Sequence, residues 1–166
     1  MKTAPFYLLL CFFLSISIAN AQQIKQLNLQ IKLVSDWKHK TEETEKIRLH
    51  AEKKTAIIEI YNYQAATSEQ ATLKMIDVLK ERGIKPDDFM KSTRANLKIG
   101  QQKYATFEGL ILTELESTKT TMKQSWKAYL TEVKGQKVFI YASEFTKDDA
   151  KITYKEDTEK MLKTLK

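Results

Sequence analysis

Apolar and polar residues alternate strictly in one segment near the start of the charged part of the chain. From Leu27 to Leu33 every second residue is leucine or isoleucine, and the residues between them are polar. A period of two places all the apolar side chains on one face of an extended chain. The pattern therefore predicts a half-buried strand over Leu27–Leu33, followed by a turn at Trp37 and a solvated loop over Lys38–Lys46.

The next two apolar runs predict a β-hairpin. Ile47–Glu52 and Thr55–Tyr63 are separated only by Lys53-Lys54, and both are rich in apolar residues. Short runs of this kind on either side of a brief polar connection are typical of paired antiparallel strands. The residues expected to point inward are Ile47, Leu49, Ile58 and Ile60.

Signals at both ends define one helix. Thr67 and Gln70 have the spacing of a capping box, in which each side chain accepts a hydrogen bond from the backbone N–H of the other residue. The apolar residues that follow recur at helical spacing as far as Arg82. Gly83 suits the left-handed conformation that often ends a helix, and Ile84 can pack back on the last turn.

The second half of the chain predicts more strands and a final helix. Tyr104–Glu114 reads as a strand, and Gly109 within it indicates a bulge or a close backbone approach. Met122–Val133 and Lys137–Phe145 are expected to form a hairpin around the turn residues 134–136. Asp148-Asp149 is expected to cap the last helix.

The faces of this last hairpin suggest how the sheet is covered. We expect three residues of its first strand, Trp126, Ala128 and Leu130, to share a face with Val138, Ile140 and Ala142. The opposite face then carries the aromatic residues Tyr61, Tyr63, Tyr129, Phe139 and Tyr141. Both faces are partly apolar, which predicts an α+β fold: an antiparallel β-sheet flanked by helices as a three-layer α/β/α sandwich. The alternative is a bare aromatic face that binds a partner, and Tyr61, Tyr63, Tyr129 and Tyr141 are its candidate residues.

This order of elements resembles a known family. A strand that runs into Trp37, a hairpin, a capped helix, a hairpin bearing Trp126 and a C-terminal helix are similar to the PsbP-like and DcrB-like α/β/α sandwich of exported proteins. The likeness covers Leu27–Leu165 and departs from the family at Asp36, where a glycine usually precedes the tryptophan. It implies a non-enzymatic accessory or binding protein, and it identifies no catalytic residue.

The first 21 residues have the three parts of a secretory signal peptide. Lys2 supplies a positive start, Phe6–Ile18 is almost wholly apolar, and Ala19-Asn20-Ala21 predicts cleavage after Ala21. A membrane anchor is the rival reading, but a 13-residue run is shorter than the roughly 20 residues that a bilayer helix needs. Lipid attachment at Cys11 is a third possibility. Residues 22–166 are then a single domain, with no later membrane-spanning segment.

Removal of this segment leaves a chain without cysteine. It has no Asn-x-Ser/Thr acceptor either, which favours a bacterial periplasmic or secreted protein. The 28 basic residues include Lys2, so 27 remain against 21 acidic ones, a net charge of +6. That excess allows weak association with an anionic envelope surface. Export and the scarcity of arginine disfavour nucleic acid as a partner.

No motif for catalysis, a metal or a cofactor stands out. His39 and His50 lack a second histidine at ligand spacing, no serine has the flanking glycines of a nucleophile elbow, and the four glycines are far apart. We therefore expect a non-catalytic protein without cofactor or metal, which acts through a protein partner or a small apolar ligand. The alternatives are a basic protein associated with the envelope surface and, less favoured, a hydrolase whose site is assembled by the fold.

Overall fold

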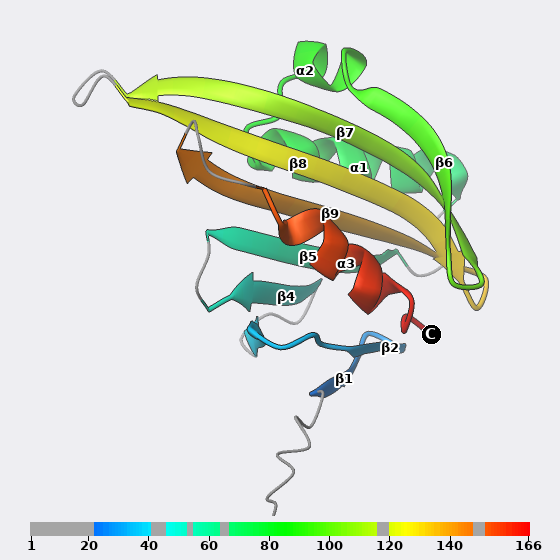
Figure 1. The fold of residues 1–166 in the computed structure, drawn as a ribbon. Helices are drawn as coiled ribbons and strands as arrows, with labels where there is room; N and C mark the ends of the chain where they lie inside the picture. The colour runs from blue at the N-terminus through cyan, green and yellow to red at the C-terminus, as the bar shows by residue number, and fades with distance from the viewer. Residues whose placement is uncertain (1–21, 41–45, 53–54, 64–66, 116–119, 148–151) are drawn as a thin grey trace, which may run out of the picture.

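The computed structural model describes residues 22–40, 46–52, 55–63, 67–115, 120–147 and 152–166. The strands within them are β1 (Gln23–Gln26), β2 (Leu29–Lys32), β3 (Trp37–Lys40), β4 (Lys46–Ala51), β5 (Ala56–Tyr63), β6 (Thr93–Ile99), β7 (Gln102–Leu115), β8 (Thr120–Val133) and β9 (Gln136–Lys147). The helices are α1 (Ser68–Glu81), α2 (Pro86–Met90) and α3 (Tyr154–Leu162). Strands β3-β4-β5-β9-β8-β7-β6 form one antiparallel sheet in that order, and β1-β2 is a separate hairpin (Figure 1).

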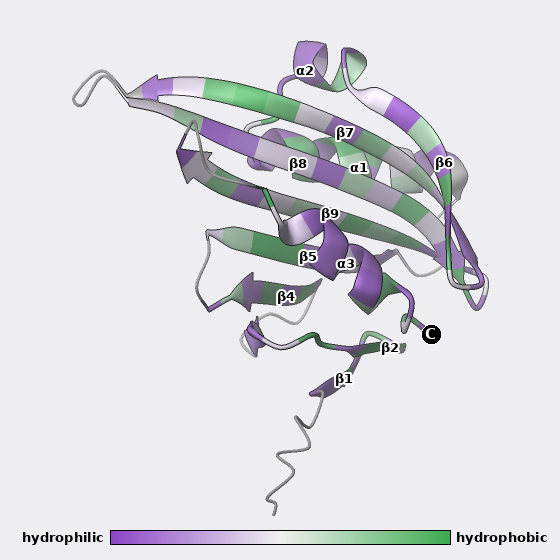
Figure 2. Ribbon diagram, viewed as in Figure 1, coloured by the Kyte–Doolittle hydropathy of each residue, from purple (hydrophilic) through white to green (hydrophobic). Residues whose placement is uncertain are grey.

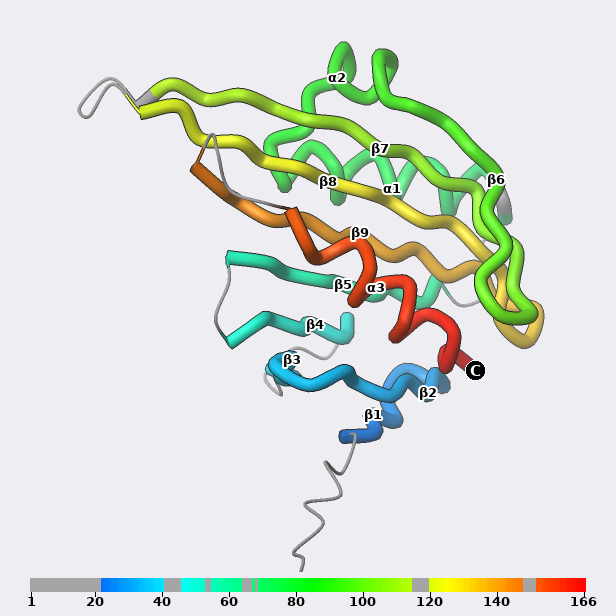
Figure 3. The backbone as a smooth tube through the Cα atoms, viewed as in Figure 1, coloured from blue at the N-terminus to red at the C-terminus, as the bar shows by residue number. Residues whose placement is uncertain are grey.

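The predicted three-layer α/β/α sandwich is wrong. Strands make up 58% of the described residues and helices only 22%, so the protein is mostly β. Helix α3 lies on one side of the sheet, and the β1-β2 hairpin covers part of the same side (Figure 3). The apolar pattern indicated that both faces of the sheet are buried. It could not indicate that a strand hairpin, rather than a helix, does much of the covering.

Each face of the sheet has its own apolar core. On one face, here called the α3 face, Ile58, Ile60 and Ile140 pack with residues of the β1-β2 hairpin and of α3. On the opposite α1 face, Trp126 and Phe139 pack with the buried side of α1. No helix in the described part of the chain is both long and apolar enough to cross a membrane.

The predicted grouping of side chains in the last hairpin is also wrong. Ala128 lies opposite Tyr141 and Tyr129 lies opposite Ile140, so Tyr129 and Tyr141 point to different faces. The turn contains only residues 134 and 135, because Val133 pairs with Gln136. The expected turn had three residues, 134–136. A turn longer by one residue shifts the register by one position and exchanges the faces of one strand, which is why the expected grouping is wrong.

The amino-terminal strand is a hairpin rather than a single strand. Leu27 and Asn28 have φ angles of 54° and 59°, and Gln26 pairs with Leu29 across them. Two successive positive φ angles define the type I′ turn, whose twist suits a two-residue hairpin. The alternation over Leu29–Lys32 does form a strand, but Trp37 begins β3 instead of forming a turn.

Local signals at α1 are confirmed. The Thr67 hydroxyl accepts from the Gln70 N–H at 3.2 Å, and the Gln70 side chain accepts from the Thr67 N–H at 2.9 Å. Gly83 has a φ of 79°, and the N–H of the buried Ile84 donates to Leu79 at 2.9 Å. Helix α3 begins only at Tyr154; Lys53-Lys54 and Asp148-Asp149 lie outside the described residues.

Gly109 makes the close approach that its place in a strand predicts. It pairs with Trp126 without a break in the ladder between β7 and β8. A Cβ atom on Gly109 would lie 2.7 Å from three atoms of the Trp126 ring, which is itself fully buried. The glycine therefore leaves the space that the indole fills.

We predict that Gly109→Ala destabilises the fold by about 1–3 kcal/mol, the usual cost of overpacking a core. The added methyl group must displace the indole or bend β7. Urea unfolding followed by tryptophan fluorescence measures the change. An unaltered midpoint would show that the ring has room to move, and Thr113→Ala, at an exposed position four residues further along β7, is the control.

Candidate functional site

The four candidate tyrosines are buried and do not share one surface. Their exposed fractions are 9% for Tyr61, 8% for Tyr63 and 0% for both Tyr129 and Tyr141. Three of them pack under α1 on the α1 face, whereas Tyr129 packs in the core of the α3 face. The fold therefore places them inside the molecule, and a partner-binding role for them stays a prediction.

Two of the buried phenols have hydrogen-bond partners, and the hydroxyls of Tyr63 and Tyr129 have none among the described residues. Tyr61 donates to Glu59 at 3.2 Å, and Gln124 donates to the Tyr141 oxygen at 3.1 Å. The ring of Tyr63 stacks on Phe139 at an interplanar angle of 12°. Burial raises the pKa of all four tyrosines, because a phenolate is poorly solvated inside the protein.

A buried carboxylate that the sequence analysis missed lies on the α1 face. Glu59 is 0% exposed, and Arg82 donates two hydrogen bonds to it, at 2.6 and 2.7 Å. Lys46 and Arg48 of the neighbouring strand approach the same carboxylate at 3.2 and 3.1 Å. The available signal was a lone glutamate between isoleucines in a strand. Its partners are distant in sequence. The ion pairs therefore hold β4, β5 and the end of α1 together.

One stretch of β7 forms an apolar edge of the sheet. Strand β6 pairs with β7 only as far as Glu108, and no described strand pairs with that side of β7 from Gly109 to Leu115. Two leucines in this stretch are largely solvent-exposed, Leu110 at 53% and Leu112 at 59%. Figure 2 shows the corresponding hydrophobic band on the free part of β7.

The register determines which backbone groups of this edge point outward. Val133 and Gln136 close a two-residue hairpin, so they form a hydrogen-bonded pair. Hydrogen-bonded pairs recur at every second position, which makes Ile111–Gln124 such a pair between β7 and β8. The N–H and C=O groups of Leu110 and Leu112 therefore point away from β8, into the space beyond the edge.

A small apolar pocket lies between α1 and α2. Its volume is about 210 Å³, and it is lined by Ile76, Leu79, Lys80, Ile84, Pro86, Phe89 and Met90. Phe89 also packs on Phe107 of β7, with ring centroids 5.0 Å apart. Ligand pockets for drug-sized molecules have volumes of about 300–1,000 Å³. This pocket therefore suits a single side chain better than a free ligand.

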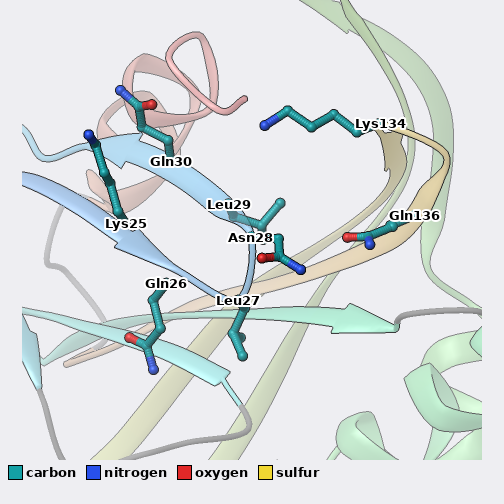
Figure 4. A pocket seen from close by; sticks show the side chains of 8 residues that line it. All are labelled: Lys25, Gln26, Leu27, Asn28, Leu29, Gln30, Lys134 and Gln136. Carbon is teal, nitrogen blue, oxygen red and sulfur yellow. The ribbon is translucent and has the colours of Figure 1, made fainter.

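A larger polar pocket of about 640 Å³ lies where the β1-β2 turn meets the β8-β9 turn. Figure 4 shows Lys134 and Gln136 extending from one turn towards Asn28 and Leu29 of the other. The complete lining is Lys25, Gln26, Leu27, Asn28, Leu29, Gln30, Lys134 and Gln136. Its side chains include two lysines, and the C-terminal residue Lys166 lies beside it, since the Gln30 N–H donates to the Lys166 oxygen at 2.9 Å.

The two histidines do not come together. His39 lies opposite Leu49, and His50 lies opposite Lys38, so the two side chains point to different faces of the sheet. Partial burial lowers the pKa of His39. Among the described residues, no three side chains of His, Cys, Asp or Glu lie close enough to hold a metal ion.

Comparison with known proteins adds little to this geometry. No family model and no curated protein matches the chain. A crystal structure from Bacteroides thetaiotaomicron is similar over 83% of this chain, at 13% sequence identity and a TM-score of 0.48. The chain spans about 44% of the length of that structure. The resemblance to PsbP-like proteins stays a prediction.

The buried tyrosines predict loss of stability in alkali. Burial also raises the pKa of Tyr104 on β7 to about 12, against an ordinary value of 10.0. A pKa that is higher in the folded state stabilises the fold below the unfolded value and ceases to do so as pH rises. Between pH 10.0 and about 12, we expect Tyr104 alone to lower the free energy of unfolding by about 1.4 kcal/mol per pH unit. Urea unfolding over that range measures the slope, and Tyr104→Phe should reduce it; an equal slope would contradict the assignment.

Removal of the Glu59 charge should be costly. We predict that Glu59→Gln destabilises the fold by about 3–5 kcal/mol, because Arg82, Lys46 and Arg48 would lose their shared counter-ion in a partly buried site. Thermal and urea unfolding measure the loss. Arg82→Lys keeps the positive charge but not the two-pronged geometry, so it should cost less than Glu59→Gln. If Glu59→Gln were as stable as the unmodified protein, the cluster would contribute nothing to the stability of the fold.

Proposed function

We propose that this chain is a non-catalytic, exported binding protein of the bacterial periplasm, which acts by capturing a protein partner along the free edge of β7. The observation that carries the proposal is the pair of exposed leucines, Leu110 and Leu112, on a strand edge whose outward backbone groups have no described strand beside them. An extended segment of the partner adds to the sheet there. Main-chain hydrogen bonds supply affinity and alternate side chains supply selectivity.

The contrast with the other edges supports this proposal. Proteins usually protect sheet edges with charged residues, especially lysine. Strand β3 carries Lys38 and Lys40, and β6 carries Arg94 and Lys98. The free part of β7 has Glu114 near its end, but its exposed residues 110 and 112 are leucines, which favour association.

The pocket between α1 and α2 lies on the α1 face, beside β7, whereas the side chains of Leu110 and Leu112 point to the α3 face, so an added strand would have one face towards each. Helix α2 contacts β7, and Phe89 joins the two through its ring contact with Phe107, whose plane is tilted by 39°. Met90 at the pocket rim is 69% exposed, and its flexible thioether adapts to partner side chains of different shapes. A side chain that follows the added strand can therefore enter this pocket, whereas its volume of about 210 Å³ disfavours the small apolar ligand.

The test is cross-linking in an extract of the native envelope, with the tagged protein and its variants compared side by side. We predict that Leu110→Lys with Leu112→Lys reduces the yield of the main cross-linked partner at least about tenfold, since charge on the edge opposes strand addition. The fold should lose no more than about 0.5 kcal/mol, because both positions are exposed.

Leu73→Lys is the matched control, because Leu73 on α1 is 57% exposed and lies away from the edge. It should leave the yield unchanged. Leu112→Pro provides a second test: it removes an outward N–H without breaking the ladder to β8, and should also abolish capture. The proposal fails if the edge variants retain the partner, or if loss occurs equally in Leu73→Lys. Loss at moderate salt in the unmodified protein would favour association with the charged envelope surface instead.

A further inference from the structure

Arg94 lies on β6, the strand that borders the free edge of β7, and it is held in place by apolar groups. Its guanidinium lies over the rings of Phe89 and Phe107, 5.6 and 5.8 Å from their centroids. One of its nitrogens lies 3.9 Å from the sulfur of Met90. Arginine binds carboxylates through two parallel hydrogen bonds, so a guanidinium fixed in this way is suited to receive one.

Carboxylates of the neighbouring elements do not neutralise this arginine. Asp87 and Asp88 begin α2, and neither forms an ion pair with Arg94. Glu108 of β7 points to the opposite α3 face, where it pairs with Lys155. A carboxylate supplied by a partner therefore meets a guanidinium whose hydrogen bonds no described carboxylate takes.

An antiparallel strand added to the free edge ends beside Arg94. Thr93 is the first residue of β6 and pairs with Glu108, so Gly109 is the last position of β7 that an added strand can face. Every pair of neighbouring strands in the large sheet is antiparallel. An added strand that continues this pattern runs from Leu115 towards Gly109 and meets β6 with its carboxyl end.

The register determines where the last side chain of such a strand points. A residue opposite Gly109 shares the α1 face with it, because Gly109 packs against Trp126 on that face. Arg94 is on the same face, since it pairs with Phe107, roughly 7 Å further along the edge at about 3.3 Å per residue. The apolar pocket between α1 and α2 also lies on this face, and its lining includes both α2 residues that contact Arg94.

We propose that the partner captured at this edge presents its own carboxyl terminus, with an apolar last residue. The last side chain enters the pocket of about 210 Å³, and the terminal carboxylate accepts hydrogen bonds from Arg94. The exposed Lys91, just before β6 begins, adds a second positive charge. A free chain end needs no path around α2, whereas a chain that continued would have to bend away from the sheet. This inference rests on the edge-binding function proposed above and names the part of the partner that is bound.

Fluorescence anisotropy with labelled synthetic peptides tests the inference on the full mature chain. The reference peptide is as long as Gly109–Leu115, has valines opposite Leu110 and Leu112 separated by threonines, and ends in leucine with a free carboxylate. The same peptide with a terminal amide should bind at least about tenfold more weakly, because it loses the charge-assisted hydrogen bonds to Arg94. A final glycine instead of leucine should also weaken binding about tenfold, because the pocket then stays empty.

Arg94→Gln removes the charge and leaves the edge in place. The free and amidated peptides should then bind equally, with the affinity that the amide has for the unmodified protein. A merely structural role of Arg94 in supporting α2 would not change the ratio of the two affinities. Lys98→Gln is the matched control, because it removes one charge from an exposed position on the same face of β6, and it should keep the preference for the free carboxylate.

Three results would overturn the inference: equal binding of the free and amidated peptides to the unmodified protein, no binding of either, or a preference that persists in Arg94→Gln. The edge proposal is judged separately. If both peptides bind equally and both are lost in Leu110→Lys with Leu112→Lys, the edge captures partner segments without recognising a chain end. If neither peptide binds, cross-linking in the envelope extract still decides whether the edge captures a partner.

Discussion

The burial of one carboxylate in an otherwise apolar strand constrains much of the surrounding architecture. A charged Glu59 is tolerated at 0% exposure only because cationic groups and a phenol reach it. Arg82, the residue that ends α1, must therefore lie over β5, beside Lys46 of β4. The Arg82 carbonyl in turn accepts from Gln124 of β8, which also donates to Tyr141. A connected set of polar contacts thus positions the helix end across several strands.

A second buried carboxylate fixes the position of helix α3 in a similar way. Glu144 of β9 accepts from the backbone N–H groups of Thr153 and Tyr154, at 2.9 and 3.1 Å. These are orphan donors at the start of α3, and a carboxylate there also interacts favourably with the helix dipole. On the same face of the sheet, Trp37 of β3 donates to Asp157 of α3 at 3.1 Å. Both helices are therefore oriented by polar contacts, while the apolar cores supply most of the driving force.

Sequence signals that act over a few residues predicted their structures well. The contacts of Thr67 with Gln70, the positive φ of Gly83 and the close approach at Gly109 all depend on neighbours or on one cross-strand partner. The assignment of faces in the last hairpin failed because it depended on counting turn residues, and an error of one residue there exchanges the faces of a whole strand. The turn at Leu27 was not predicted either, because leucine is not one of the residues that indicate a type I′ turn.

The candidate binding surfaces could not be predicted, because each depends on where a neighbouring element stops. Leu110 and Leu112 are exposed because β6 has 7 residues and β7 has 14, so half of the longer strand extends past its neighbour. The polar pocket exists because two turns that are distant in sequence meet at the same end of the molecule, with Asn62 between them. Both surfaces are consequences of unequal strand lengths and of turn placement.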